Sequence, residues 1–543
     1  MPRTDLTVPA VALLALAAGC AVGPTYLAPR ASGPAAFAEV RPGAPIGAGT
    51  PTGAAADPVA LSRWWTVLHD PELDSLVDRA LRNNRDLKTA VSRVREARAE
   101  RQMAAGALLP EVNATAGYNR SLGSKNVVLP LGAPAGGSSS SGGSGASGSG
   151  SRGASLPGRV RPQEESGSPA EAPTAGAEQG VQPGGPDSPF GEGGLPGVTT
   201  NLYQAGFDAV WEVDLFGGTR RALEAASAET AAAQEGEYGV QVTLMAEVAT
   251  TYLQLRETQE REGVARLNIE SQRQTWKISR DKFQQGLGDE VEAAQLLEQL
   301  KVSETALPPL ESAERVAQHA LAFLLGLEPT ALSAELAVPK AFPPLPPEVP
   351  VGVPSDLLRR RPDVRKAERE LAAASAEIGV ATAELYPQFS LTGSFGLDSS
   401  TVRLLPEWSS HYYSIAPGVS WPILDWAKLH AAIRVQNELQ SQALLAYETA
   451  VSQALKDVED ALVQFQFERD RRRGLVAAVA EARHAQQVTA EIYSQGLADQ
   501  TASLQSERAV FQAEDSLAQS EGALRMDLVS LYKALGGGWQ IDR

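Results

Sequence analysis

Apolar and polar residues alternate strictly in four short segments of the chain. In "QFSLTGSFGL" every second residue from Phe389 to Leu397 is apolar or glycine, and most of the residues between them are polar. The same alternation runs through "EVNATAGYN" (111–119), "YQAGFDAVWE" (203–212) and "YYSIAPGVSW" (412–421). Successive side chains of a strand point to opposite faces of the sheet, so each segment is predicted to be a β-strand with one apolar face.

Two proline-free stretches, 197–307 and 423–543, are rich in Ala, Glu, Gln, Leu and Arg, which favour helices. Apolar residues recur there at spacings of three, four and seven, as in Leu455, Val458, Leu462 and Phe465, which is the pattern of coiled-coil packing. A single helix from Trp426 to Gln495 would be roughly 100 Å long at about 1.5 Å per residue. The sequence therefore predicts two very long helices, each followed by a glycine-containing turn and a shorter returning helix.

The two halves of the chain resemble each other. "LRNNRDL" at 81–87 matches "LRRRPDV" at 358–364 with a shift of 277 residues, and "FQQGLGD" at 283–289 matches "YSQGLAD" at 493–499 with a shift of 210 residues. The two shifts differ by about the length of a segment rich in Gly, Ser and Pro at 123–197. Such a composition cannot bury a core, so we expect two structural repeats, the first carrying a disordered insertion.

Cys20 is the only cysteine among 543 residues and therefore has no partner for an internal disulfide. Behind Arg3 lies an apolar run from Val8 to Ala18, followed by Gly19. This arrangement resembles a bacterial secretion signal that ends in a lipobox, where the cysteine is acylated and becomes the new N-terminus. The alternative is a small buried apolar cysteine.

These patterns divide the chain into consecutive parts. The predicted parts are a lipoprotein signal peptide (1–19), a lipid-anchored N-terminal segment (20–61), a first repeat (62–335), a Pro-rich linker (336–354), a second repeat (355–538) and a C-terminal tail (539–543). Within each repeat we expect a helix, a pair of strands and a long helical hairpin.

Composition narrows the possible functions. The net charge of -17 argues against a nucleic-acid partner, because phosphates require a basic surface. The five histidines lie far apart at positions 69, 319, 411, 430 and 484, and the chain has no GxSxG, P-loop or HExxH motif. We therefore expect no enzyme activity, metal site or cofactor.

Beyond Cys20 no stretch is apolar enough for a transmembrane helix, so entry into a membrane would require a β-barrel. Judged by the strands alone, a soluble sheet packed on one face is the favoured interpretation, but the very long helices reverse that preference. Four strands cannot close a barrel in lipid, where the smallest known examples have about eight. Several chains would have to pool their strands, and their long helices would then form a ring and a hollow tube.

Several longer motifs resemble those of the TolC-like outer-membrane factor family, in particular its OprM/NodT-type efflux lipoproteins. The motifs are "CAVGPTY", "WWTVLHDPELDSLVDRAL", "WEVDLFGGTRR", "PSDLLRRRPDVRKAERELAAASAEIGVATAELYPQFSLTGSFG", "APGVSWPILDWAKLHAAI", "QALKDVEDAL" and "LYKALGGGW". The resemblance implies an α+β membrane protein: a homotrimer with a twelve-stranded transmembrane β-barrel, four strands per chain, continuous with a periplasmic α-helical barrel. A collar would be built from the chain ends and the linker.

The resemblance also implies a function. Such proteins are the outer-membrane exit ducts of tripartite pumps, passing drugs or other small toxic molecules from an inner-membrane RND-type transporter through a periplasmic adaptor. Cys20 would carry palmitate and anchor the chain to outer-membrane lipid, with the helices extending into the periplasm. Two alternatives remain: a lipid-tethered coiled-coil scaffold without a pore, for which the strands would be superfluous, and a type I protein-secretion duct.

The family's functional residues map to the two helical turns. The adaptor-contact tips correspond to Gly286, Leu287, Gly496 and Leu497. At the periplasmic gate, family members carry Leu and Asp where this chain has Thr501 and Gln505. The nearby carboxylates are Asp289, Glu290, Glu292 and Asp499, which are expected either to form charged rings around the pore or to be solvated residues of a helix turn.

Overall fold

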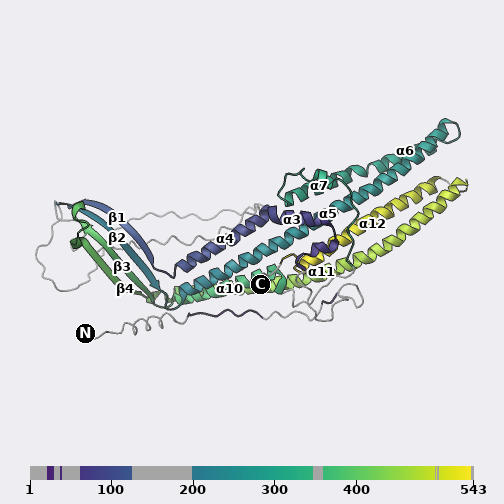
Figure 1. Cartoon of the computed structure of the whole chain (residues 1–543). Coiled ribbons are helices and arrows are strands. Elements are labelled where there is room, and N and C mark those ends of the chain that lie inside the picture. Colours follow the sequence, from purple (N-terminus) through teal and green to yellow (C-terminus); the bar gives the residue numbers. More distant parts are fainter. Residues whose placement is uncertain are drawn as a thin grey trace, which may run out of the picture. The chain divides into compact units, whose positions relative to one another are not determined.

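The computed structural model describes residues 21–29, 37–39, 61–124, 198–346, 359–495, 497 and 500–539. The chain's elements follow in the order η1 (Trp64–Leu68), α3 (Pro71–Asn83), α4 (Arg85–Gly106), β1 (Glu111–Leu122), β2 (Thr199–Val213), α5 (Gly218–Gln284), α6 (Glu290–Glu304), α7 (Leu307–Leu324), α8 (Ser333–Leu336), α10 (Pro362–Ala383), β3 (Gln388–Ser399), η2 (Val402–Leu404), η3 (Trp408–Ser410), β4 (His411–Ser420), η4 (Ile423–Asp425), α11 (Trp426–Ser494) and α12 (Gln500–Ala534). The chain divides into two compact units, one made of the strands and one mainly of the helices (Figure 1).

The strands form a four-stranded sheet in the order β1-β2-β3-β4, so β1 and β4 are its edges. One face is apolar and exposed: Val112, Phe207, Phe395 and Ile415 are 60%, 56%, 54% and 72% accessible. The other face is more polar, and there Thr115 donates a hydrogen bond to Asp208 (Oγ1–Oδ2, 3.3 Å). The strands that alternation predicted are confirmed, and the apolar face is the exposed one.

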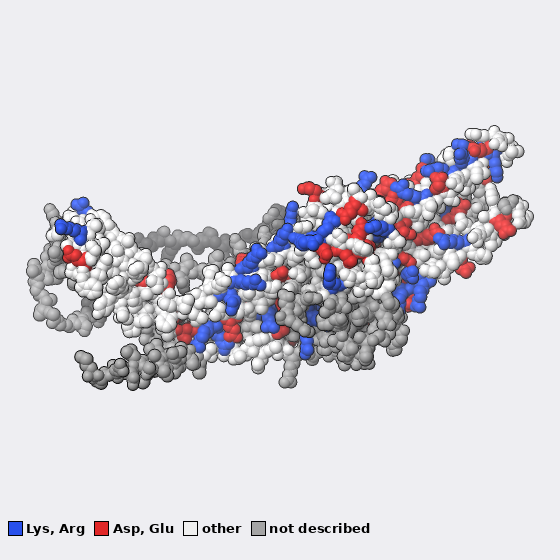
Figure 2. All heavy atoms as spheres, viewed as in Figure 1, with Lys and Arg blue, Asp and Glu red and all other residues white. Residues whose placement is uncertain are grey.

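The helices lie side by side in a layer. In one part of it α4, α5, α10 and α11 are neighbours in that order, and in the other α12 lies between α5 and α11 while α6 and α7 pack on α5. The predicted long helices are confirmed: α5 has 67 residues and α11 has 69. Acidic and basic side chains are mixed over their surfaces (Figure 2), which is consistent with the many ion pairs between turns of these helices.

The returning helices differ from each other. In the second half of the chain the returning helix α12 is continuous. In the first half it is divided into α6 and α7, because Pro308 and Pro309 occupy the first turn of α7, where a helix can begin but cannot continue from the preceding turn. Among the described residues, no helix is long and apolar enough to cross a membrane.

The main hydrophobic core joins distant parts of the chain at one level of the helical layer, here called the collar. Its buried side chains come from η1, α3, α4, α5, α7, α8, α11 and α12 and from residues between these elements. Trp64 stacks on Tyr532 with ring centroids 5.4 Å apart, and Trp539 donates a hydrogen bond to the Arg360 carbonyl oxygen (3.1 Å). Segments near both chain ends therefore hold the middle of α5.

Candidate functional site

The first hairpin turns between α5 and α6 at Gly286. Gly286 has φ +73°, a conformation that L side chains rarely adopt, and the amide of Leu287 donates to the Lys282 carbonyl oxygen (2.9 Å). The turn leaves the Leu287 side chain 76% accessible. The sequence-predicted tip is thus a closed turn that presents one apolar side chain to solvent.

The second hairpin turns in the same way between α11 and α12. The amide of Leu497 donates to the Ile492 carbonyl oxygen (3.0 Å), and the Leu497 side chain is 77% accessible. Gly496 and Asp499 lie outside the described residues. Both hairpins therefore end in a leucine whose side chain is exposed to solvent.

The acidic residues of the first tip have different surroundings. Asp289 is the N-cap of α6, where its carboxylate accepts from the amide of Val291 (3.1 Å). Glu290 is exposed, and Glu292 is half-buried. Negative charge in the first turn also stabilises a helix, so these residues contribute to the structure of α6 itself. In the second tip, Thr501 and Gln505 are both exposed on α12.

A hydrogen bond joins the two hairpins close to their tips. The hydroxyl of Tyr493 donates to Glu292 Oε1 (3.0 Å), and burial together with this bond raises the pKa of Tyr493. Arg508 donates to Gln299 further from the turns. Sequence reasoning missed Tyr493, although a signal was present: the matching position of the first hairpin is Phe283, which has no hydroxyl.

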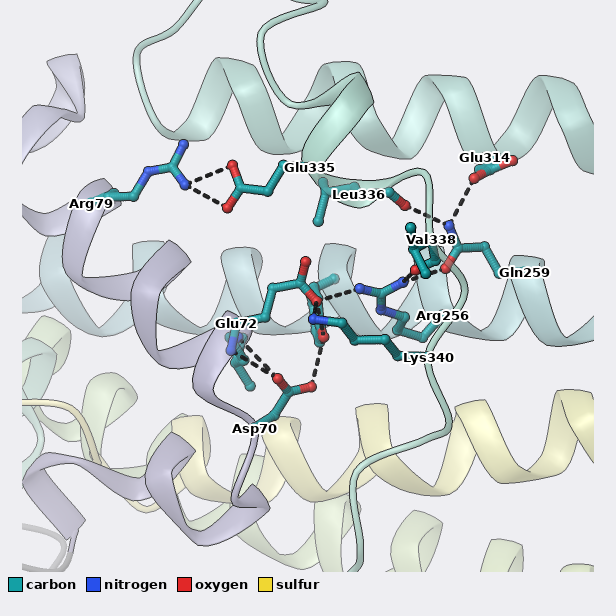
Figure 3. A network of polar contacts seen from close by, with 12 residues as sticks. Asp70, Glu72, Arg79, Arg256, Gln259, Glu314, Glu335, Leu336, Val338 and Lys340 are labelled. Atoms are coloured by element: carbon teal, nitrogen blue, oxygen red, sulfur yellow. Dashed lines mark hydrogen bonds and ion pairs between the residues drawn. The ribbon is translucent and has the colours of Figure 1, made fainter.

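A polar cluster in the collar connects α3 and the segment after α8 to α5 (Figure 3). Arg256, 1% accessible, pairs with Glu72 and donates to Gln259 Oε1 (2.5 Å) and to the Val338 carbonyl oxygen (2.9 Å). Lys340 also pairs with Glu72 (2.8 Å). Burial opposes ionisation of Glu72, but Lys340 and Arg256 outweigh it and keep the pKa of Glu72 below its usual value. The cluster fixes α3 and the segment after α8 onto α5.

Two side chains bridge the points where helices meet end to end. Asn84, the N-cap of α4, donates through Nδ2 to the Leu324 carbonyl oxygen at the end of α7 (2.8 Å). Arg361, the N-cap of α10, donates to the Ala534 carbonyl oxygen at the end of α12 (3.2 Å). Each donor satisfies a carbonyl that the helix end leaves without an internal partner. Arg361 also pairs with Asp363 and Asp457.

Cys20 lies outside the described residues, but the residues that follow it are placed. Val22 donates its amide to the Phe216 carbonyl oxygen (3.0 Å), and Arg221 donates to the Val22 carbonyl oxygen (3.2 Å). A Cβ on Gly217 would come within 2.7 Å of the Ala21 Cα. The segment after Cys20 is thus held against the junction of β2 and α5. We find no group of three or more metal-ligating side chains in the part of the chain that the structure describes.

Comparisons with known proteins agree with this architecture. The family model described as outer membrane efflux protein matches residues 76–157, 179–327 and 353–537. The pyoverdine export outer membrane protein OpmQ of Pseudomonas putida is 31% identical over 92% of this chain and 93% of its own length. The outer membrane protein OprJ of Pseudomonas aeruginosa is 27% identical over 98% and 96% of the two chains.

Comparison with solved structures also finds similarity to outer-membrane channels. The outer-membrane channel OprN is 30% identical and superposes with a TM-score of 0.76 over 96% of this chain and 100% of that chain. The CmeC outer membrane channel of Campylobacter jejuni has a TM-score of 0.76 over 96% of each chain at 19% identity, and so supports the fold alone. Because the family model and a relative above 30% identity each cover most of its length, this chain belongs to the outer membrane efflux protein family, the outer-membrane channel components of efflux pumps.

Proposed function

We propose that three copies of this chain form one duct, in which their sheets close a twelve-stranded barrel and their helices close a tube. This proposal rests on one observation: the edges of the sheet and of the helical layer are left uncovered by the rest of the described chain. The edges of the sheet are β1 and β4, and unpaired strand edges are not tolerated in lipid. Closure by identical copies would pair β4 of one chain with β1 of the next.

The margins of the helical layer support the same closure. At one end of the layer lie α4, α6 and α7, and at the other lies α11. Apolar side chains are exposed on both: Val316 and Phe323 of α7 are 62% and 71% accessible, and Val435 and Phe467 of α11 are each 57% accessible. Burying a side chain of this size stabilises an interface by about 1.5–3 kcal/mol. A neighbouring copy of the chain would cover both margins.

Equivalent hydrogen bonds support the proposed internal repeat. Asn84 and Arg361 differ by the shift of 277 residues found in the sequence, and their acceptors, Leu324 and Ala534, differ by the shift of 210. In the same way, Trp211 donates to the Leu108 carbonyl oxygen and Trp421 to that of Leu385, each at 3.1 Å. A duct of three chains would therefore have six similar units around its axis.

We assign adaptor contact to the exposed tip leucines, Leu287 and Leu497. A periplasmic adaptor whose own tip is apolar would bury both side chains, and an inner-membrane RND-type transporter would deliver the substrate through it. We assign the gate to the same end of the helices, where the Tyr493–Glu292 hydrogen bond holds the hairpins together. The carboxylates of Glu290 and Asp499 are then proposed to favour cations near the axis.

The anchor is proposed at Cys20. The segment that begins at Ala21 is held at the junction of β2 and α5, where a transmembrane strand would meet the periplasmic helix. Acyl chains such as palmitate on Cys20 would enter the inner leaflet of the outer membrane there. Mass analysis of the N-terminal peptide of the mature protein tests this proposal: acylated Cys20 supports it, and an unmodified or absent cysteine contradicts it.

The substrates are proposed to be small molecules, including drugs and other toxic compounds. Relatives are named for pyoverdine export, toluene efflux and solvent efflux, which are chemically diverse. Deletion of the chain from its own host should therefore increase sensitivity to several unrelated compounds, and re-expression should restore resistance. A host with unchanged sensitivity to all of them would contradict this assignment.

Cross-linking tests the threefold arrangement. Cys20 is the only cysteine and would be acylated, so two introduced cysteines would be the only free thiols. Phe467→Cys on α11, combined in turn with Val316→Cys and Phe323→Cys on α7, should give an oxidised ladder that ends at three chains. Phe467→Cys with Leu267→Cys is the control, because Leu267 lies on α5 in the middle of the layer and is 75% accessible. A ladder that ends at two chains, or only monomers, would contradict the trimer.

A further inference from the structure

A recess of about 830 Å³ opens at the level where the helices meet end to end. It lies among the starts of α4 and α10, the ends of α7 and α12, and the middle of α5 and α11. Its volume is within the range of about 300–1,000 Å³ that is usual for sites that bind drug-sized molecules.

Two glycines of α5, Gly236 and Gly239, keep the recess open. A Cβ on Gly236 would meet only Lys366 Cδ at 3.9 Å, and one on Gly239 only Pro362 Cβ at 4.0 Å, which are ordinary contact distances. Neither packing nor backbone conformation requires a glycine at position 236 or 239. Each one nevertheless costs about 0.5–1 kcal/mol in a helix interior compared with alanine. The structural role that remains for these two glycines is to leave the space of the recess unfilled.

The lining is acidic. Six carboxylates and three basic side chains surround the recess. Arg361 is engaged with Asp363 (2.6 Å) and Asp457 (2.9 Å), and Lys366 with Glu370 (3.5 Å). Two acidic lining residues, Asp86 and Glu247, form no ion pair with any residue that the structure describes. Among the basic lining residues, the same is true of Lys533. The uncompensated charge is therefore negative.

Glu235 supplies an unsatisfied buried acceptor. The residue is 5% accessible, and its Oε1 pairs with Arg365 (2.5 Å). Its Oε2 is buried without a hydrogen-bond partner among the described residues. Burial raises the pKa of Glu235, so a cation close to this carboxyl would favour its ionised form. Buried oxygens are rarely left unpaired, which points to a donor that comes from outside the chain.

We propose that this recess binds an amphiphilic organic cation of drug size. The ammonium or aromatic cation would lie beside Glu235, and its apolar body would contact Val240, Leu324 and Pro362. Glu247 lies about 18 Å further along α5 and, like Asp86, adds to the negative charge of the lining. This inference goes beyond the proposed duct, because it concerns a binding site formed by side chains of the chain itself.

The recess borders the collar core, because Leu244, Ala461 and Ala534 line the recess and also belong to that core. Glu235, Gly239 and Thr243 recur every four residues on one face of α5, and about 3.6 residues make one helical turn. Met245, Val248 and Tyr252 belong to the collar core and lie on the roughly opposite face. The bound cation would therefore lie on the side of α5 that is turned away from Met245, Val248 and Tyr252.

The test is a titration with ethidium, an aromatic cation, followed by fluorescence anisotropy. The full mature protein is placed in nanodiscs of zwitterionic phosphatidylcholine, which do not attract the dye electrostatically. Gly239→Leu fills the recess, and Gly263→Leu is its matched control, because Gly263 also lies on α5 and a Cβ added there would meet no atom within 4 Å. Glu247→Gln removes one lining charge, and Glu260→Gln removes an exposed charge of α5 outside the recess.

We expect one saturable site per chain, affinity reduced about tenfold or more by Gly239→Leu and about threefold by Glu247→Gln, and little change in either control. An anionic dye, 8-anilinonaphthalene-1-sulfonate, should not compete. Absence of saturable ethidium binding, or equal effects of Gly239→Leu and Gly263→Leu, would overturn the proposal. Mass photometry of the same samples separates the two proposals: trimers without binding contradict this site alone, and binding by single chains contradicts the trimer alone.

Discussion

Tyr493 of α11 donates a hydrogen bond to Glu292 of α6 over 3.0 Å and so connects the two helical hairpins beside their tips. No backbone hydrogen bond could do this, because each helix satisfies its own backbone. This bond depends on one hydroxyl, which the matching Phe283 of the first hairpin lacks, whereas Arg508 and Gln299 join the hairpins further from the turns. A single substitution can therefore remove the connection nearest the tips without altering either turn.

Tyr493→Phe is expected to increase the open population of the channel about fivefold, since a hydrogen bond of this kind contributes about 1 kcal/mol. Single-channel conductance in a planar bilayer measures the change. Glu292→Gln retains an acceptor oxygen and should resemble the wild type more closely than Glu292→Leu. Tyr447→Phe, at a tyrosine buried elsewhere on α11, is the control. Equal conductance of Tyr493→Phe and wild type would contradict the assigned gate.

Leu287→Asp is expected to weaken adaptor binding at least about tenfold while leaving assembly unchanged. The side chain is 76% accessible in the isolated chain, and burying a leucine contributes about 1.5–3 kcal/mol. Surface-plasmon resonance with the adaptor of the host's own pump measures the affinity. Leu267→Asp makes the same change at an equally exposed leucine away from the tip. If both variants bound the adaptor alike, the tips would not be its contact.

Asn84→Asp is expected to destabilise the collar by about 1–3 kcal/mol. Aspartate can still accept from the Leu87 amide, which Asn84 does at 2.9 Å, but it cannot donate to the Leu324 carbonyl oxygen. Asn84 is 3% accessible, so the lost donor is not replaced by water. The midpoint of thermal unfolding should fall for Asn84→Asp and stay nearly unchanged for Asn83→Asp, whose side chain is exposed. Equal midpoints would refute the bridging role.

Asp527 of α12 makes stability depend on pH. Burial, and secondarily the nearby charge of Glu468, raises the pKa of Asp527 to about 6. A carboxyl with a raised pKa stabilises the fold when protonated, so its contribution is complete below about pH 4 and is lost as the pH rises through 6. Asp527→Asn should therefore increase the free energy of unfolding at pH 8 by up to about 2 kcal/mol, seen as a higher midpoint of thermal unfolding. At pH 4 it should have little effect. A gain at pH 4 that equals the gain at pH 8 would contradict this account.

Much of the fold could be predicted from local pattern. Alternation identified the strands around Phe207 and Ile415, and heptad-like spacing identified α11 within about a residue of its ends. These predictions succeeded because a strand or a long helix repeats one geometric rule over many residues. The break between α6 and α7 was not predicted, since two prolines in a first turn are also compatible with the start of an ordinary helix.

The site was less predictable because its contacts join residues far apart in sequence. The turn glycine Gly286 and the exposed Leu287 followed from a short motif. Tyr493 and Glu292 are separated by 201 positions, and no local pattern brings them together. Asp289 illustrates a different limit: the sequence was compatible with a pore ring or with a solvated residue of a helix turn, and its role as the N-cap of α6 was not predicted.

Three copies of this chain are proposed to close one continuous duct. Single-particle imaging of the mature protein, purified from outer membranes in mild detergent, shows both the number of chains and the passage. We predict a hollow particle with threefold symmetry, in which α11 of each copy lies beside α4, α6 and α7 of the next and the sheets form one barrel of twelve strands. A particle that contains a single chain, a different number of chains, or no central passage would contradict the account.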